Sequence, residues 1–288
     1  MLMKKTQTQD NPSALNKEFL EEYSSNDSLR RYSRETAGHG ISYLLDHDYG
    51  EIYLGVIEKS IPKSRLQRGL RLWEFGCGAG MNLLFLVSTL ERRGIPVELA
   101  IGTDFSDALI DAANRQAAQY LPAGLRQKVH FCVARHENLV EETTKGLGIS
   151  KEELLNSFDL MVGVNTIRYC HRLNNENEVA ATIKSLLAES GVCVVIDMND
   201  KFPVFRSRFR DQVTKEERAY YLPSLDEYGR PFSTAGFNIL RHENFCWIPH
   251  SAGRGLTAVM KMLTPTLNAV APKRAMRSLV IAQKQTQR

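Results

Sequence analysis

The chain has 288 residues, 43% of them apolar and 24% charged, and a formal net charge of +4 at pH 7. This length suits one large domain with appendages, and the apolar share is enough for a sizeable core. The positive charge is too mild to suggest a nucleic-acid-binding protein. No signal-peptide core and no long uncharged apolar run occurs, so we expect a cytoplasmic protein without a membrane partner.

The first 66 residues have a polar start followed by a pattern of two or three helices, broken at Gly38 and Gly40. We predict that residues 1–66 form a helical cap over a ligand crevice. Arg34 lies in this segment and is a candidate for binding a substrate anion, although a solvated helix face is the commoner explanation for such an arginine.

Five short, nearly continuous apolar runs follow, with helical patterns at 81–94, 106–121 and 175–191 between them. Runs of this kind are typical of parallel strands buried on both faces. Ser106 is placed to cap one helix, and Gly94 and Gly191 are placed to end two. The alternation predicts a doubly wound α/β core over residues 67–199, with ligand at the carboxyl ends of the strands. The predicted strands are 70–75, 97–104, 128–134, 158–164 and 191–198.

Residues 200–223 form a basic and aromatic insertion after the fifth strand. Arg206, Arg208, Arg210 and Tyr221 are its candidate substrate-binding residues, because arginine forks match carboxylate and phosphate oxygens. A solvated face is again the commoner explanation. Residues 224–288 then complete the sheet with a helix ending at Gly236 and two strands.

Three glycines at alternate positions, Gly76, Gly78 and Gly80, follow the first strand directly. Glycine permits a positive φ and close approach of the backbone to a ligand. A dinucleotide fingerprint would need glycine where Met81 stands. Glu74 would repel a pyrophosphate but attract an ammonium group, and Asp104 ends the second strand, where a carboxylate binds ribose hydroxyls. S-adenosylmethionine (SAM) has both an ammonium group and a ribose without a phosphate.

Glu74 to Gly80, Asp104 and the segment FDLMVGVNTIRYCH together resemble the motifs of class I SAM-dependent methyltransferases. The resemblance covers roughly residues 70 to 285. It implies a mostly parallel seven-stranded sheet with the last strand antiparallel, and SAM as cofactor without a metal. The expected cofactor-binding residues are Glu74, Gly76, Gly78, Gly80, Asn82, Asp104, Phe105, Arg135, His136 and Asn165.

Two departures from the family pattern bear on how adenine is bound and on which targets are methylated. Arg135 and His136 stand where many members have an acidic residue facing the adenine amino group. The fourth strand ends in Asn165-Thr166-Ile167-Arg168, without the two prolines and the aromatic residue typical of enzymes that methylate base or amide nitrogens. DNA, glutamine and adenine are therefore disfavoured as targets.

We expect methyl transfer to a small, anionic metabolite, such as a prenyl diphosphate or a carboxylate. His171 and Tyr169, after the fourth strand, are the candidate catalytic residues, and Arg168 is a candidate for the substrate. A surface histidine without a function is an equally good interpretation of His171. The alternatives are an RNA cap-type methyltransferase, which the modest charge disfavours, and a non-catalytic SAM-binding regulator.

The five cysteines are odd in number, widely spaced and without a C-x-x-C pair. This pattern fits neither a disulfide framework nor a zinc site, so we expect buried thiols and no metal. The oligomeric state is open.

Overall fold

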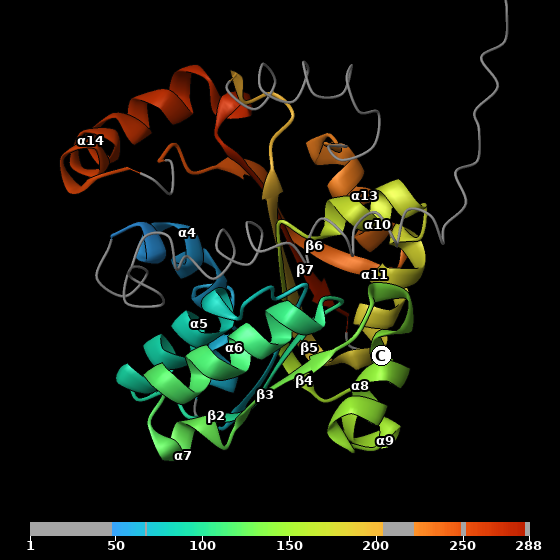
Figure 1. The fold of residues 1–288 in the computed structure, drawn as a ribbon. Coiled ribbons are helices and arrows are strands. Elements are labelled where there is room, and N and C mark those ends of the chain that lie inside the picture. The colour runs from blue at the N-terminus through green and yellow to red at the C-terminus, as the bar shows by residue number, and fades with distance from the viewer. Residues whose placement is uncertain (1–47, 67, 204–221, 249–251, 286–288) are drawn as a thin grey trace, which may run out of the picture.

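Seven strands form one sheet in the order β3-β2-β1-β4-β5-β7-β6 (Figure 1). The structure is a computed structural model that describes residues 48–66, 68–203, 222–248 and 252–285. The pairs from β3 to β5 are parallel, and β7 is antiparallel to both neighbours. The predicted doubly wound, mostly parallel sheet is confirmed, including its antiparallel last strand. The strands are β1 (Leu70–Phe75), β2 (Val97–Asp104), β3 (Val129–Val133), β4 (Phe158–Val164), β5 (Leu187–Met198), β6 (Phe237–Phe245) and β7 (Arg277–Lys284).

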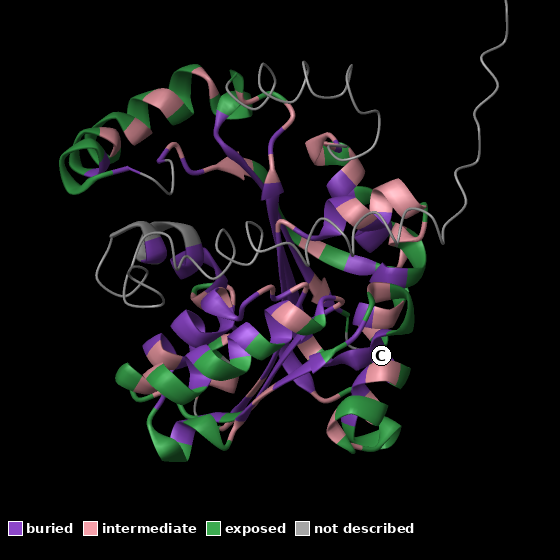
Figure 2. Ribbon diagram, viewed as in Figure 1, coloured by how far each residue is buried: buried purple, intermediate pink, exposed green. Residues whose placement is uncertain are grey.

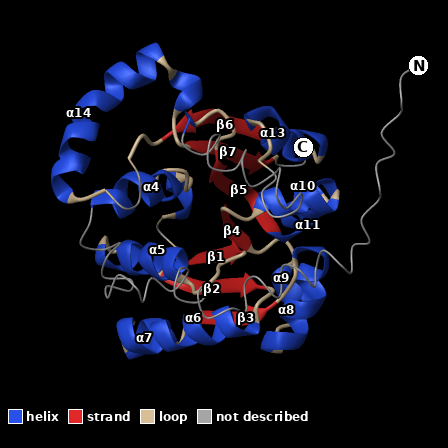
Figure 3. Cartoon of the chain, turned by 45° about the horizontal axis from the view of Figure 1, so that its top comes forward, coloured by secondary structure: helices blue, strands red, loops and turns tan. Residues whose placement is uncertain are grey.

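Helices cover both faces of the sheet (Figure 3). One face packs against α4 (Asp48–Glu58), α5 (Met81–Arg92), α6 (Asp107–Tyr120) and α7 (Ala123–Arg126). The other face packs against α8 (Leu139–Leu147), α9 (Lys151–Leu154), α10 (Ile167–Leu173), α11 (Glu176–Leu186) and α13 (Leu225–Thr234). The short helices η2 (Lys63–Arg65), η3 (His136–Asn138) and η4 (Pro272–Arg274) lie in connections, and α14 (Arg254–Val270) joins β6 to β7.

The buried strands explain why the sequence reads as apolar runs. Every residue of β4, the central strand, is buried, and burial decreases toward the outer helices (Figure 2). The predicted bounds of β1, β2 and β4 match the observed ones. Ser106 caps α6 as expected, because its Oγ accepts a hydrogen bond from the Leu109 amide.

The start of β5 differs from the prediction. The helical pattern predicts that the fourth helix continues to Gly191, but α11 ends at Leu186 and β5 begins at Leu187. Gly191 therefore lies inside the strand. A Cβ there would lie 2.8 Å from the Phe158 carbonyl oxygen and 2.9 Å from that of Ala188, so glycine serves close backbone packing and not a helix end.

Much of the predicted helical cap and of the basic insertion lies outside the described residues. Of residues 1–66, the structure describes α4, η2 and the turns around them, and of residues 200–223 it describes 200–203 and 222–223. Arg34, Arg206, Arg208, Arg210 and Tyr221 all fall outside, and their roles stay predictions.

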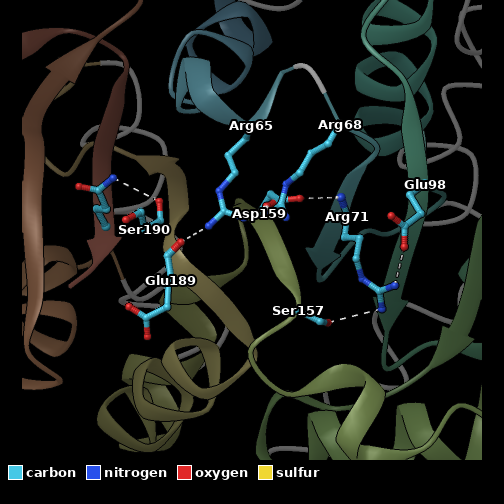
Figure 4. A network of polar contacts seen from close by, with 9 residues as sticks. Arg65, Arg68, Arg71, Glu98, Ser157, Asp159, Glu189 and Ser190 are labelled. Atoms are coloured by element: carbon cyan, nitrogen blue, oxygen red, sulfur yellow. Dashed lines mark hydrogen bonds and ion pairs between the residues drawn. The ribbon is translucent and has the colours of Figure 1, made fainter. Parts of the chain in front are cut away.

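An arginine cluster ties the segment after α4 to the amino end of the sheet (Figure 4). The buried Asp159 carboxylate at the start of β4 accepts hydrogen bonds from Arg65 Nη1 at 3.0 Å, Arg68 Nη2 at 2.7 Å and the Arg71 amide at 3.1 Å. Arg65 also donates to the Glu189 carbonyl on β5. The Asp159 carboxylate thus links β4 to η2, to the segment after η2 and to β1. These contacts lie at the amino ends of the strands, opposite the predicted ligand site.

All five cysteines are buried and unpaired, as predicted. In the described ranges, no helix has the length and apolar character needed to cross a membrane.

Candidate active site

The glycine loop adopts a conformation that requires glycine. Gly76, Gly78 and Gly80 have φ values of 65°, 54° and 76°, in the left-handed region. A Cβ on Gly76 would lie 2.1 Å from Thr166 Oγ1, and one on Gly80 would lie 2.8 Å from the Phe131 ring. A Cβ on Gly78 would meet nothing within 4 Å. Gly76 and Gly80 therefore permit close packing against Thr166 and Phe131. Of the three glycines, only Gly78 faces open space, where a ligand can approach the backbone.

Glu74, at the end of β1, is buried under this loop. Its Oε1 accepts a hydrogen bond from Asn82 Nδ2 at 2.9 Å and its Oε2 accepts one from the Leu83 amide at 3.0 Å. Both donors belong to the first turn of α5, so the carboxylate stabilises the helix start. Burial nevertheless raises the pKa of Glu74 to about 8. The predicted cofactor-binding residues Glu74 and Asn82 are thus in contact with each other.

Asp104, at the end of β2, meets the loop from the neighbouring strand. Its Oδ2 accepts a hydrogen bond from the Gly78 amide at 2.9 Å, and its Oδ1 accepts one from the Ser106 amide at 3.0 Å. Burial raises the pKa of Asp104 to about 6. Because each carboxylate oxygen can accept more than one hydrogen bond, Asp104 can hold the loop and still accept hydrogen bonds from ribose hydroxyls.

An apolar cluster lies beside the loop and unites two predicted site residues. Ala79 of the loop packs with Leu109 and Ala112 of α6, and Phe105, Tyr169 and Leu173 pack against them. Phe105 follows β2, whereas Tyr169 and Leu173 come from α10 after β4. The structure therefore brings the candidate catalytic Tyr169 to the glycine loop.

Arg135 and His136, which follow β3, have different surroundings. Arg135 is exposed and forms an ion pair with Glu142 of α8, with Nη2 to Oε1 at 2.5 Å. His136 Nε2 lies 3.1 Å from Thr166 Oγ1, and its ring packs edge-on against Phe75. Burial lowers the pKa of His136 to about 4, so its imidazole is neutral at pH 7. His136 thus contacts Thr166, the residue that packs against Gly76, whereas Arg135 is held by α8.

Asn165 follows β4 directly and precedes Thr166. It has a φ of 56°, and its Oδ1 accepts a hydrogen bond from Arg277 Nη1 of β7 at 2.7 Å. The buried Arg277 was not predicted as a site residue. No motif marks it, because the contact joins positions 112 residues apart.

Arg168 is a predicted substrate-binding residue, but its described contacts are internal. The guanidinium is buried, with Nη1 3.1 Å from Met198 Sδ and 3.8 Å from Asp197 Oδ1. Its Nη2 donates a hydrogen bond to the Tyr169 hydroxyl at 2.8 Å, and its Cζ lies 4.8 Å from the centroid of the Tyr169 ring. Arg168 therefore holds Tyr169 and is itself held by the end of β5.

Asp197 is a further buried residue that sequence reasoning missed. Its carboxylate accepts hydrogen bonds from the amides of Met198 and Arg168. Burial raises the pKa of Asp197, whereas the nearby Arg168 and Arg277 lower it. An aspartate at the end of an apolar strand is the signal that could have found it, as it did for Asp104.

His171 lies in a different cluster from Tyr169. Its Nδ1 is 3.9 Å from Glu176 Oε1 of α11, and its ring packs edge-on against the buried Tyr228 of α13. Burial lowers the pKa of His171. The two candidate catalytic residues are two positions apart on α10 and point to different neighbours, with only Tyr169 packing on the glycine loop.

Among the described residues, no group of three or more histidine, cysteine, aspartate or glutamate side chains is arranged to hold a metal ion.

Comparison with known proteins places these features in a family. A family model described as a methyltransferase domain matches residues 66–249. A non-reducing polyketide synthase, SAT8, of Stachybotrys chartarum is 28% identical over 148 residues, which are 51% of this chain and 5% of that protein. This chain therefore corresponds to a small part of that relative.

Solved structures share the fold at low sequence identity. A SAM-dependent methyltransferase from Mesorhizobium loti has a TM-score of 0.53 at 16% identity, over 80% of this chain and 96% of that one. The CMeT domain of the citrinin polyketide synthase has a TM-score of 0.52 at 17% identity, over 76% of this chain and 48% of that one. Phosphoethanolamine N-methyltransferase 2 of Haemonchus contortus, in complex with SAM, has a TM-score of 0.54 at 15% identity, over 81% and 52% of the respective chains.

Proposed function

The chain belongs to the methyltransferase domain family, and we propose that it transfers the methyl group of SAM to a small-molecule acceptor. The observation that carries this proposal is the hydrogen bond between Asp104 and the glycine loop. The Asp104 carboxylate binds the amide of Gly78, the one motif glycine that faces open space. A carboxylate that could accept hydrogen bonds from a ribose and a bare backbone surface thus lie side by side at the carboxyl end of the sheet.

In this proposal the cofactor is held by residues from three strand ends. Asp104 would accept hydrogen bonds from the ribose, the backbone at Gly78 would face the ligand, and Phe105 and Tyr169 would supply apolar contacts. Burial raises the pKa of Glu74 to about 8, and a cationic group bound beside this carboxyl would favour its ionised form. When bound, SAM supplies an electrophilic methyl group on a positively charged sulfur.

The residues around that position act by placement and by excluding water. Methyl transfer is an in-line displacement, which depends mainly on the alignment of the acceptor. Tyr169 is our candidate for contacting the acceptor, because it packs on the glycine loop and its hydroxyl is fixed by Arg168. His171, packed between α11 and α13, is the weaker candidate for a base.

The class of acceptor is a separate proposal. Two of the similar proteins are polyketide synthases or parts of them, which favours a small organic acceptor over a macromolecule. The narrower expectation of an anionic acceptor, a prenyl diphosphate or a carboxylate, now depends on Arg34, Arg206, Arg208 and Arg210. Arg168 does not add to it, because its guanidinium is engaged by Asp197, Met198 and Tyr169.

Calorimetry with SAM and with its demethylated product tests the cofactor site. We expect saturable binding of both, and a loss of about 1 to 3 kcal/mol in Asp104→Ala, which removes a charged hydrogen-bond acceptor. Asp107→Ala is the matched control, since Asp107 is exposed three residues away. Equal affinities in wild type and Asp104→Ala would remove Asp104 from the site.

A turnover assay separates an enzyme from a non-catalytic SAM-binding protein. The formation of demethylated product is measured with a panel of small acceptors that includes β-keto thioesters, carboxylates and prenyl diphosphates. We expect product with at least one class and none in Gly78→Ala, whose new methyl group would occupy the ligand surface. SAM binding without turnover on any class would favour the regulatory alternative.

A further inference from the structure

Apolar side chains are exposed on α14 to an extent not seen elsewhere in the described chain. Seven large apolar side chains of the described residues are more than 40% exposed, and five of them belong to this helix. Met262 is 81% exposed and Val270 is 79% exposed. Single exposed apolar residues need no explanation, but a group on one helix marks an interaction surface. The group is Leu256, Val259, Met262, Leu263 and Val270.

These residues form a stripe that follows the helical repeat. Leu256, Val259, Leu263 and Val270 are separated by three, four and seven residues, so they lie on one face, and Met262 follows Val259 by three. Over 14 residues the stripe is about 20 Å long at 1.5 Å per residue. Thr257 is buried and Met260 packs against the core, so a different face of α14 contacts the protein.

The position of α14 leaves this stripe accessible. The helix lies at the periphery of the molecule, and most of its length is exposed (Figures 1 and 2). Trp247, before α14, contacts the helix near its end, with Nε1 donating a hydrogen bond to Asn268 Oδ1 at 2.7 Å.

Charge identifies the kind of partner. The last 45 residues of the chain, 244–288, contain no aspartate or glutamate and seven lysines and arginines. Arg254 and Lys261 of α14 are exposed, as are Lys273 and Arg274 just after Val270. On β6, the Glu243 carboxylate is paired with Arg241. The segment that carries the stripe is therefore apolar and basic, and the acidic residues of the neighbouring α4 belong to a separate element.

We propose that α14 docks the protein on an anionic lipid surface, with its apolar stripe inserted among the lipids and its basic residues near the headgroups. A basic amphipathic helix binds membranes in this way by combining apolar burial with attraction to anionic lipids. A second copy is a poorer partner, because a symmetric contact would bring the same basic surface of both copies together. This peripheral contact differs from a membrane span and modifies the sequence-based expectation of no membrane partner.

Vesicle flotation of the full chain tests the proposal. We expect binding to vesicles of equimolar phosphatidylcholine and phosphatidylglycerol, no binding to vesicles of phosphatidylcholine alone, and release at high salt. Met262→Asp and Val270→Asp should each weaken binding by about tenfold or more, because an acidic group opposes both insertion and attraction. Ala123→Asp on α7 is the matched control and should bind as wild type does, since Ala123 is exposed and α7 lies at the opposite end of the molecule from α14 (Figure 1).

Three outcomes would overturn the proposal. These are absence of binding to both kinds of vesicle, equal binding by wild type and the two α14 variants, and a dimer in light scattering that Met262→Asp converts to a monomer. The last result would assign the stripe to a second copy. Circular dichroism and SAM affinity of both variants show that they fold, since both altered side chains are almost fully exposed. The outcome is independent of the methyl acceptor.

Discussion

The ionisation of Asp104 should make cofactor binding depend on pH near 6. Its pKa is raised to about 6 by burial, and a ribose hydroxyl donates best to the ionised form. Below this pKa the carboxyl is protonated, so SAM affinity should fall toward tenfold per pH unit, and it should rise as the pH increases through 6. Calorimetry between about pH 5 and pH 7.5 measures this.

Asp104→Asn provides the comparison for this pH dependence. The amide does not ionise, so we expect weaker SAM binding at neutral pH and a flatter profile across the same range. Wild-type affinity that is constant from pH 5 to pH 7.5 would show that Asp104 does not titrate in the site.

Arg168 and Tyr169 form the second pair whose roles can be separated. Arg168 donates to the Tyr169 hydroxyl at 2.8 Å and is anchored by Asp197. If Arg168 acts through Tyr169, Tyr169→Phe should lower kcat, and adding Arg168→Met to it should cost much less than Arg168→Met costs alone. The double-mutant cycle should give a coupling of about 1 kcal/mol or more. Additive losses, or losses in KM alone, would instead assign Arg168 to the substrate.

For individual residues, the sequence predicts which side chains lie at the site better than it predicts their hydrogen-bond partners. Glu74 and Asp104 are found because each ends an apolar strand beside a glycine loop. Their hydrogen bonds to Leu83 and Gly78 follow from the folded loop and cannot be read from spacing. The pairing of Arg168 with Asp197 joins positions 29 residues apart, so the sequence suggests a substrate role for Arg168 and does not reveal its internal partner.

At the element scale, the Asp159 cluster joins the segment after α4 to β4 and β5. The side chain of Asp159 is 1% exposed. It accepts hydrogen bonds from the Arg65 guanidinium, which is also largely buried, and from the Arg71 amide. Asp159→Asn should lower the free energy of unfolding by about 3 kcal/mol, because it leaves a poorly solvated guanidinium without its counter-charge. Urea denaturation measures the loss.

Arg68→Met is the matched test of the same cluster. The Arg68 side chain is 56% exposed, so its ion pair with Asp159 is screened and should contribute well under 1 kcal/mol. SAM affinity should stay unchanged in both variants, since the cluster lies at the opposite edge of the sheet. Equal losses of stability in Asp159→Asn and Arg68→Met would show that Arg68 contributes as much as the buried contacts of Asp159, contrary to this prediction.

Element boundaries show where local pattern fails. The segment Leu186-Leu187-Ala188 continues the helical pattern of α11, yet the chain turns into β5 at Leu187 because that residue pairs with Phe158 of β4. The pairing of distant strands overrides local propensity there. The predicted strands β1, β2 and β4 match because most of their residues are buried, which makes most of their length apolar.

At the scale of the whole molecule, stability and ligand binding make opposite demands on one buried carboxylate. Burial raises the pKa of Glu74 to about 8, so the folded protein without ligand binds its proton more tightly than the unfolded chain does. In the proposed complex, a cationic cofactor would favour the ionised form instead. Ionisation of Glu74 at neutral to alkaline pH should therefore destabilise the unliganded protein more than the liganded one.

Glu74 should accordingly make the free energy of unfolding depend on pH. Its ordinary pKa is 4.5 and its folded pKa is about 8, so its stabilising contribution is complete below 4.5 and is lost as the pH rises to 8. Between about pH 5.5 and pH 8.5 we expect wild type to lose at least about 2 kcal/mol relative to Glu74→Gln, whose amide does not titrate. Urea denaturation at the two pH values measures this difference, with Glu98→Gln as the exposed control. If SAM binds beside Glu74 as proposed, saturating SAM should reduce the loss, because the cationic ligand would pair with the ionised carboxylate. A wild-type curve parallel to that of Glu74→Gln would mean that Glu74 has the same protonation in the folded and unfolded chain.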